Sequence, residues 1–352
     1  MARLEGSMSH IRASDGPRHG ASRSGNAPAG PTSPLTSGLP LVALVVVGIA
    51  CLQALMLVLF SWPNARLAPR DLPIAVAGPP QAVERFEREL ERSRPGAFTL
   101  HRVADAQAAR ERVRNRDDYG AVILGPDGPF VLTASAASTP VAQLLPQVGA
   151  AANEGRPVPV NDVVAAPSGD PRGTGLGTGM LPLILTPMAC GIVLSLVVRR
   201  LRWRVMGAAA FSIVGGLAST GLLQGWVGAL DGPYLTNAGV AGLMMLAISW
   251  TVVGLTSVFG KAGIGVGALL MFLVGNPLSG ITSAPEMLPQ PWGTLGQYLP
   301  PGAAGNLLRS TAFFDGNGAG GHLAVLLTWI LGAALLVLTK WLLERRRRAA
   351  QA

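Results

Sequence analysis

The stretch from residue 275 to residue 314 reads GNPLSGITSAPEMLPQPWGTLGQYLPPGAAGNLLRSTAFF and lies between two long apolar runs. Prolines divide it, and because an interior proline removes a backbone donor and clashes with the preceding helical turn, one continuous helix is excluded. The pieces between the prolines are nevertheless apolar. Broken backbone at membrane depth persists only where other protein buries it or where it lines a wet cavity. Two interpretations follow: a loop on the membrane surface, or a pair of short re-entrant or interfacial helices that cap a membrane bundle.

The second interpretation gives particular residues of this stretch a role. Trp292 and Tyr298 are of the types that favour the membrane–water boundary. Arg309 is expected to remain near water or to pair with Glu286, and the prolines are expected to form the corners that keep the short helices apart. The candidate cap residues, in a broken segment at 284–314, are Pro285, Glu286, Pro289, Trp292, Tyr298, Pro300, Pro301 and Arg309.

The composition of the whole chain indicates an integral membrane protein. Hydrophobic residues make up 49% and charged residues only 13%, and the mean hydropathy is +0.40. An average soluble domain has about 25% charged residues. Apolar runs near or above the length that crosses a bilayer core predict an α-helical polytopic protein with six transmembrane helices. The first is an uncleaved anchor, and the other five belong to a membrane domain at 180–343; the predicted spans are 39–60, 180–198, 205–229, 236–259, 262–282 and 322–343.

A segment of different character separates the first two spans. Acidic residues and arginines are equally frequent over residues 63–177, and short apolar runs alternate with helical patterns. This alternation predicts a small α/β domain at 63–166 with a largely parallel sheet, followed by a Gly-rich tether at 167–179. The expected strands are 72–77, 98–103, 119–124, 130–133 and 158–164, and the expected helices are 81–94, 104–116 and 139–152.

Basic residues are segregated to one side of the predicted membrane topology. They occur in the tail at 1–38, which has no hydrophobic period and is expected to be disordered, in the loop at 199–204 and in the tail at 344–352. The positive-inside rule therefore predicts that both termini are cytoplasmic and that the domain at 63–166 is extracytoplasmic. The abundance of Arg over Lys suggests a bacterial source, hence the bacterial cell membrane. The basic residues are interpreted as a topology signal that touches anionic lipid, not as a nucleic-acid surface.

No pattern of residues indicates catalysis. The histidines are scattered and no cysteine pair has metal-ligand spacing, so we expect no metal, no cofactor and no catalytic site, and the chain is not predicted to be an enzyme. Polar residues within the spans are candidates for a polar path through the membrane. Hydrogen bonding between helices is the alternative for each of them. The best candidates are Gln53, Gln224 and Asn276.

Several short motifs in this layout resemble the ABC-2 type permeases, and most closely the YhgE/Pip-like group. The matching residues are DLPIAV at 71–76, YGAVI at 119–123, PEMLP at 285–289, YLPP at 298–301 and LLR at 307–309. The resemblance implies the membrane half of an exporter, a homodimer or heterodimer that works with a separately encoded ATP-binding subunit. Contact with that subunit would fall on the loop residues Arg199, Arg200, Arg202 and Trp203, which otherwise serve only to fix orientation. A non-transporting surface or secretion-accessory protein that binds partners through its ectodomain is the alternative.

Overall fold

The computed structural model describes residues 38–350, so the expectation of a disordered tail lies almost wholly outside the described residues. The described chain divides after Leu52 into two units. The first unit contributes the beginning of helix α1. The second holds the sheet, the remaining helices and every contact described below.

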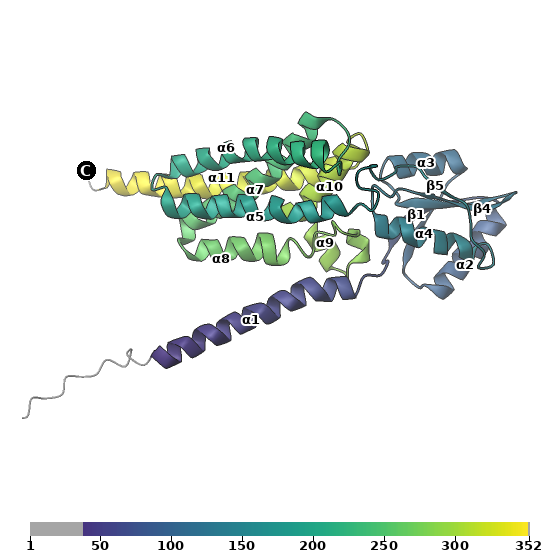
Figure 1. Cartoon of the computed structure of the whole chain (residues 1–352), viewed down its shortest axis with the longest axis horizontal. Helices are drawn as coiled ribbons and strands as arrows, with labels where there is room; N and C mark the ends of the chain where they lie inside the picture. The colour runs from purple at the N-terminus through teal and green to yellow at the C-terminus, as the bar shows by residue number, and fades with distance from the viewer. Residues whose placement is uncertain (1–37, 351–352) are drawn as a thin grey trace, which may run out of the picture. The chain divides into compact units, whose positions relative to one another are not determined.

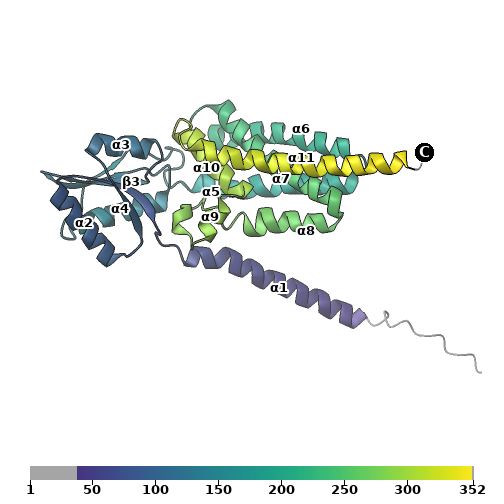
Figure 2. The same cartoon turned by 180° about the vertical axis from the view of Figure 1, so that it is seen from behind.

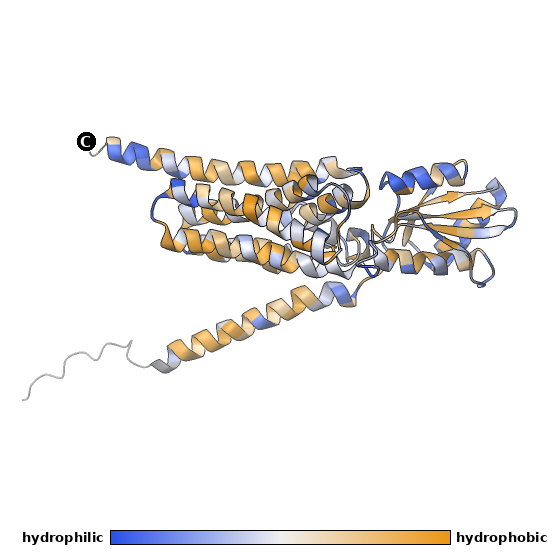
Figure 3. Ribbon diagram, turned by 45° about the horizontal axis from the view of Figure 1, so that its top comes forward, coloured by the Kyte–Doolittle hydropathy of each residue, from blue (hydrophilic) through white to orange (hydrophobic). Residues whose placement is uncertain are grey.

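Five of the described helices are long and apolar enough to cross a membrane. Their apolar character is visible as the orange ribbon in Figure 3, whereas the end of α11 and parts of the sheet-domain helices are blue. These helices indicate a multi-pass membrane protein. They are α1 (Gly38–Ala65), α5 (Thr174–Val197), α6 (Leu201–Thr220) continued by the π-helical η1 (Gly221–Trp226), α7 (Tyr234–Phe259) and α11 (Ala319–Ala349).

Helix α7 is the centre of the bundle. It packs against α5, α6 and α11, which run alongside it in both views (Figures 1 and 2). Its apolar window is 67% buried, whereas that of α11 is 11% buried. An apolar helix that is buried on most sides requires a shell of other helices, and the outward faces of that shell remain apolar as a lipid-facing surface must.

The fifth predicted span, at 262–282, is shorter than expected. Helix α8 (Ala262–Ala268) and its π-helical continuation η2 (Leu269–Val274) end at Val274, where turns begin. A helix from Ala262 to Val274 is about 20 Å long at 1.5 Å per residue, less than the ~30 Å of a bilayer core. The described structure therefore supports five spanning helices and does not confirm a sixth.

The α/β domain predicted between the first two spans is present, and we call it the sheet domain. Its order is β2-β1-β3-β4-β5. All pairs are parallel except the β3–β4 hairpin, as expected for strands joined by helices. The strands are β1 (Leu72–Ala77), β2 (Phe98–Arg102), β3 (Gly120–Gly125), β4 (Gly128–Thr133) and β5 (Val160–Asp162).

Helices cover both faces of this sheet. Helices α2 (Pro80–Ser93) and α4 (Thr139–Ala151) pack on the face formed by Leu72, Ile74 and Val76 of β1. Helix α3 (Ala106–Arg114) packs through Ala109 on the opposite, alanine-rich face. The predicted apolar side of α2, formed by Val83, Phe86 and Leu90, is buried, which confirms the sequence-based assignment.

The segment predicted as a Gly-rich tether is partly helical. Helix α5 begins at Thr174, inside the expected 167–179 tether. The Asp170 carboxylate explains the early start, because it accepts hydrogen bonds from the backbone amides of Thr174 at 3.0 Å and Gly175 at 2.6 Å. A carboxylate satisfies the free amides of a first helical turn and opposes the positive end of the helix dipole.

Candidate functional site: the cap and the cavities beside it

The cap segment, residues 284–314, contains three short helices. They are the 3₁₀-helix η3 (Pro285–Met287), α9 (Trp292–Gly296) and α10 (Pro300–Phe313). Pro300 and Pro301 occupy the first turn of α10, where the missing amide removes no helical hydrogen bond. Almost every residue of α10 is buried, so the segment is helical and packed in protein rather than a plain surface loop.

Glycines allow the cap to pack at backbone distance. A Cβ atom at Gly296 would lie 1.7 Å from the carbonyl oxygen of Leu278, and one at Gly305 would lie 2.0 Å from Cδ1 of Ile281. No larger residue fits at Gly296 unless backbone moves, because a carbonyl oxygen cannot swing aside as a side chain can. The cap is therefore held in place by close approach as well as by apolar burial.

The aromatic residues predicted at the membrane boundary are exposed. Trp292 is 44% and Tyr298 is 63% exposed, as an interfacial position requires. The carbonyl of Tyr298 accepts a hydrogen bond from Nε1 of Trp329 on α11 at 2.8 Å. The buried prolines Pro289 and Pro300 lie at the corners between the short helices.

The expectation for Arg309 was wrong. Its side chain is neither near bulk water nor paired with Glu286: the residue is only 6% exposed, and its Nη2 donates to the carbonyl of Ile281. Glu286 instead accepts a hydrogen bond from the hydroxyl of Tyr119 at 2.8 Å. The sheet domain supplied the partner of Glu286, and a sequence pattern could not show that contact.

Arg116, just after α3, attaches the sheet domain to α10. Its Nη1 donates to the carbonyl of Asn306 at 2.8 Å and to Oγ of Ser310 at 2.6 Å, and its Nη2 donates to Oδ1 of Asn306 at 3.1 Å. The guanidinium also lies 5.2 Å from the centre of the Phe314 ring. Arg116 has φ +64°, a left-handed conformation that favours glycine at a helix end. The hydrogen bonds of its side chain offset the cost of holding a non-glycine residue in this conformation.

The segment after α1 also joins the cap. The amides of Ala68 and Arg70 donate to the carbonyls of Met287 and Glu286, each at 3.0 Å. Nη1 of Arg70 donates to the Met287 carbonyl as well, at 2.9 Å. The cap is therefore bound by two different parts of the chain, the α1–β1 connection and the end of α3.

A cavity of about 300 Å³ lies beside these contacts, lined in part by Arg116, Tyr119 and Glu286. Burial raises the pKa of Tyr119 well above its usual 10, and the negative charge of Glu286 raises it further. Burial lowers the pKa of Arg116, although a guanidinium remains protonated at neutral pH. Sequence reasoning missed Arg116, since a lone arginine after a helix has no distinctive pattern.

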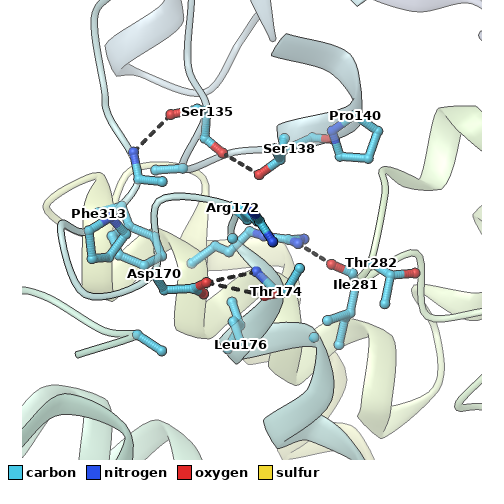
Figure 4. A pocket seen from close by; sticks show the side chains of 18 of the residues that line it. Ser135, Ser138, Pro140, Asp170, Arg172, Thr174, Leu176, Ile281, Thr282 and Phe313 are labelled. Carbon is cyan, nitrogen blue, oxygen red and sulfur yellow. Dashed lines mark hydrogen bonds between the residues drawn. The ribbon is translucent and has the colours of Figure 1, made fainter. Parts of the chain in front are cut away.

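A larger cavity of about 470 Å³ lies between the sheet domain, the start of α5 and the cap. Figure 4 shows the Asp170 carboxylate directed at Thr174, with Arg172 and Leu176 close by. Arg309 and Phe313 line it from α10, and Ile281 and Thr282 from the segment that precedes the cap. The cavity thus combines one buried cation with several hydroxyl groups and apolar walls.

The predicted ATPase-contact residues lie in and beside a basic groove at the other end of the bundle. The groove, about 1040 Å³, is lined by Arg199 and Arg200 of the α5–α6 loop, by Arg202 and Arg204 of the first turn of α6, which begins earlier than the predicted span, and by Lys340, Glu344, Arg345 and Arg348 of α11. Trp203 is 50% exposed, and the Arg202 guanidinium lies 5.5 Å from its ring centre. Nε of Arg204 donates to the carbonyl of Val198 at 2.6 Å and so holds the loop in place.

The three polar-path candidates are not brought together. Gln53 is exposed on α1, and Asn276 is half-buried in the turns after η2. Gln224 donates to the Gly232 carbonyl at 2.8 Å and accepts a long hydrogen bond from Asn237 at 3.5 Å. No hydrogen bond among the described residues connects the three candidates to each other.

Within residues 38–350, no group of three or more His, Cys, Asp or Glu side chains is placed to hold a metal ion. Comparison of the whole chain with known protein families, with curated proteins and with solved structures finds no match.

Proposed function

We propose that the chain is the membrane subunit of an exporter of the ABC-2 permease type, which dimerises and works with a separately encoded ATP-binding subunit. Both termini lie in the bacterial cytoplasm and the sheet domain lies outside the cell membrane. The helix from Ala262 to Val274, together with the turns that follow it, makes the remaining, sixth crossing. The segregation of basic residues supports this orientation, as does the basic end of α11.

The observation that best supports the proposal is the burial of the cap segment at the end of the bundle. A proline-broken segment whose 14-residue helix is almost wholly buried covers the end of a membrane bundle, and a folded domain binds it through Arg116 and Tyr119. Backbone of this kind is expected where a bundle closes a pathway, because irregular backbone at membrane depth is tolerated only inside protein or beside water. A movement of the sheet domain would be transmitted to the cap through these hydrogen bonds.

The basic groove supports the second part of the proposal. Seven of its lining side chains are basic and one is acidic, Glu344. Such a surface favours an acidic partner and accelerates its association. The exposed, arginine-stacked Trp203 beside it has the character of an interface anchor. An ATP-binding subunit with a complementary acidic surface would engage this end of the bundle.

Copurification tests the proposal. The full chain, affinity-tagged in its native membranes, is expected to retain a polypeptide that labels with an azido-ATP analogue. The variant R202A/W203A is expected to insert normally and lose that polypeptide. The matched control is W62A/R66A, which removes another exposed tryptophan and arginine. If the chain purifies without any ATP-binding polypeptide, or if R202A/W203A retains it fully, the exporter proposal fails.

The alternative is a non-transporting surface or secretion-accessory protein. It is favoured by the 470 Å³ cavity at the base of the sheet domain, since a ligand site on an ectodomain requires no transport. The same copurification distinguishes the two, because this alternative expects partners bound to the sheet domain and none that bind ATP.

A further inference from the structure

The buried charge of Arg309 has no carboxylate partner among the described residues. Five ion pairs occur in the described part of the chain, and none includes Arg309. Within residues 38–350, the one acceptor that its guanidinium contacts is the Ile281 carbonyl, although a guanidinium has five N–H groups. A buried cation without a counter-charge is costly, so this site is incomplete as it stands.

Asp170 does not supply the missing charge, although it lines the same cavity. Both of its carboxylate oxygens accept hydrogen bonds from the first turn of α5, so its negative charge is balanced by the helix end. Arg116 is a second cation that adds to the positive potential around Arg309. Burial first, and then the charge of Arg116, lower the pKa of Arg309 to about 10, so the guanidinium of Arg116 adds positive charge near that of Arg309.

The cavity walls define the rest of the ligand. The exposed Arg172 stands at the rim, hydroxyl groups of Thr139, Thr174 and Thr282 line the sides, and Leu176 and Phe313 add apolar surface. The volume of about 470 Å³ lies in the range of small-molecule sites, which combine mostly apolar walls with a few polar groups. Figure 4 shows these walls converging from the sheet domain, the start of α5 and the cap.

We propose that this cavity binds a small organic anion whose carboxylate or phosphate group pairs with Arg309 and whose short apolar body lies against Leu176 and Phe313. Arginine suits either group, because its planar fork donates two parallel hydrogen bonds to an oxyanion. The inference goes beyond the proposed function, since such a site could serve transport, sensing or assembly, and it is tested on the purified chain alone.

Hexyl phosphate is the first probe, with hexanoate and hexanol as competitors. The purified full chain in a neutral detergent is expected to broaden the phosphorus resonance of hexyl phosphate. Hexanoate should reverse the broadening and hexanol should not. Inorganic phosphate is expected to compete more weakly than hexyl phosphate, because it lacks the apolar body. Repeating the titration in nanodiscs tests the source: competition by phosphatidylglycerol, but not phosphatidylcholine, assigns the site to a lipid headgroup rather than a free solute.

Arg309→Met is expected to weaken the affinity by about 10- to 150-fold, the value of a charged hydrogen bond of ~1.5–3 kcal/mol. R85M is the matched control, because Arg85 is an exposed arginine on α2 outside the cavity lining, and it should bind as wild type does. Gln143→Trp provides a second test that leaves Arg309 in place: Gln143 is exposed and lines the cavity, so a tryptophan there should fill the site without disturbing the core. Binding that is absent in wild type, unchanged in R309M, or unchanged in Q143W would overturn the proposal.

Discussion

Removing the Arg116 side chain should loosen the sheet domain from the cap without unfolding either. The informative change is Arg116→Met, which retains the length of the side chain and removes every donor. Three hydrogen bonds from a charged donor are lost, at 2.6–3.1 Å to Asn306 and Ser310. The apolar contact with Phe314 is retained in part.

Two opposing effects set how much docking free energy Arg116→Met removes. Hydrogen bonds that involve a charged group contribute ~1.5–3 kcal/mol each, but a half-buried methionine no longer has to be desolvated as a cation. The net loss of docking free energy is about 2–4 kcal/mol, which corresponds to a roughly 30- to 700-fold larger undocked population at ~1.4 kcal/mol per factor of ten.

Hydrogen exchange in detergent measures this population at two defined positions. The amides of Ala68 and Arg70 donate across the interface to Met287 and Glu286, so their exchange should accelerate by the same factor. Amides inside β1 should remain protected, because the sheet itself is intact.

Arg114→Met is the matched control, since Arg114 is an exposed arginine of the same helix. If R116M and R114M exchange at the same rate at Ala68 and Arg70, Arg116 does not hold the interface and the argument for a coupled cap is refuted.

Three further predictions concern packing, protonation and topology. Gly296→Ala should lower the free energy of unfolding by about 3 kcal/mol, the upper end of the usual cost of overpacking, because the new Cβ meets a backbone carbonyl at 1.7 Å. Gly332→Ala, with no atom within 4 Å of its Cβ, should be neutral or slightly stabilising, and thermal denaturation measures both. Tyr119 should be the last tyrosine to ionise in an absorbance titration, because its folded pKa lies well above the usual 10. Its contribution to the stability of the folded state is complete below pH ~10 and is lost as the pH rises through the folded pKa. Tyr119→Phe should abolish this loss of stability. In a background without Cys51 and Cys190, cysteines at Asp127 and Asn317 should react with an impermeant maleimide on intact cells and one at Ala350 should not; labelling at Ala350 would contradict the proposed orientation.

Local patterns predicted most of the secondary structure. The alternation of short apolar runs with helical segments located every strand of the sheet domain, and the side of α2 formed by Val83, Phe86 and Leu90 followed from spacing alone. Prolines correctly divided the cap, because proline acts on its own backbone and on the preceding turn. The early start of α5 was missed, because glycines suggest a flexible tether and the capping carboxylate of Asp170 was not recognised.

The site itself could not be predicted, because it consists of contacts between distant residues. Arg116 and Asn306 are 190 residues apart, and Tyr119 and Glu286 are 167 apart. Nothing in one sequence indicates that the partner of Glu286 is a tyrosine on the sheet domain rather than Arg309. The burial of Arg309 depends on the packing of α10 as a whole, and no local spacing encodes it.

The bond between Arg70 and Met287 constrains the order in which the molecule is completed. These residues are 217 apart, so at ~5–20 residues per second the ribosome needs about 10–40 s to supply the partner after Arg70 has emerged. The sheet domain has time to fold during that interval, but the amides of Ala68 and Arg70 have no cap to bind. The connection after the first helix therefore stays unpaired until the start of the cap has been synthesised, and only α9, α10 and α11 remain to be added to the bundle after that contact can form.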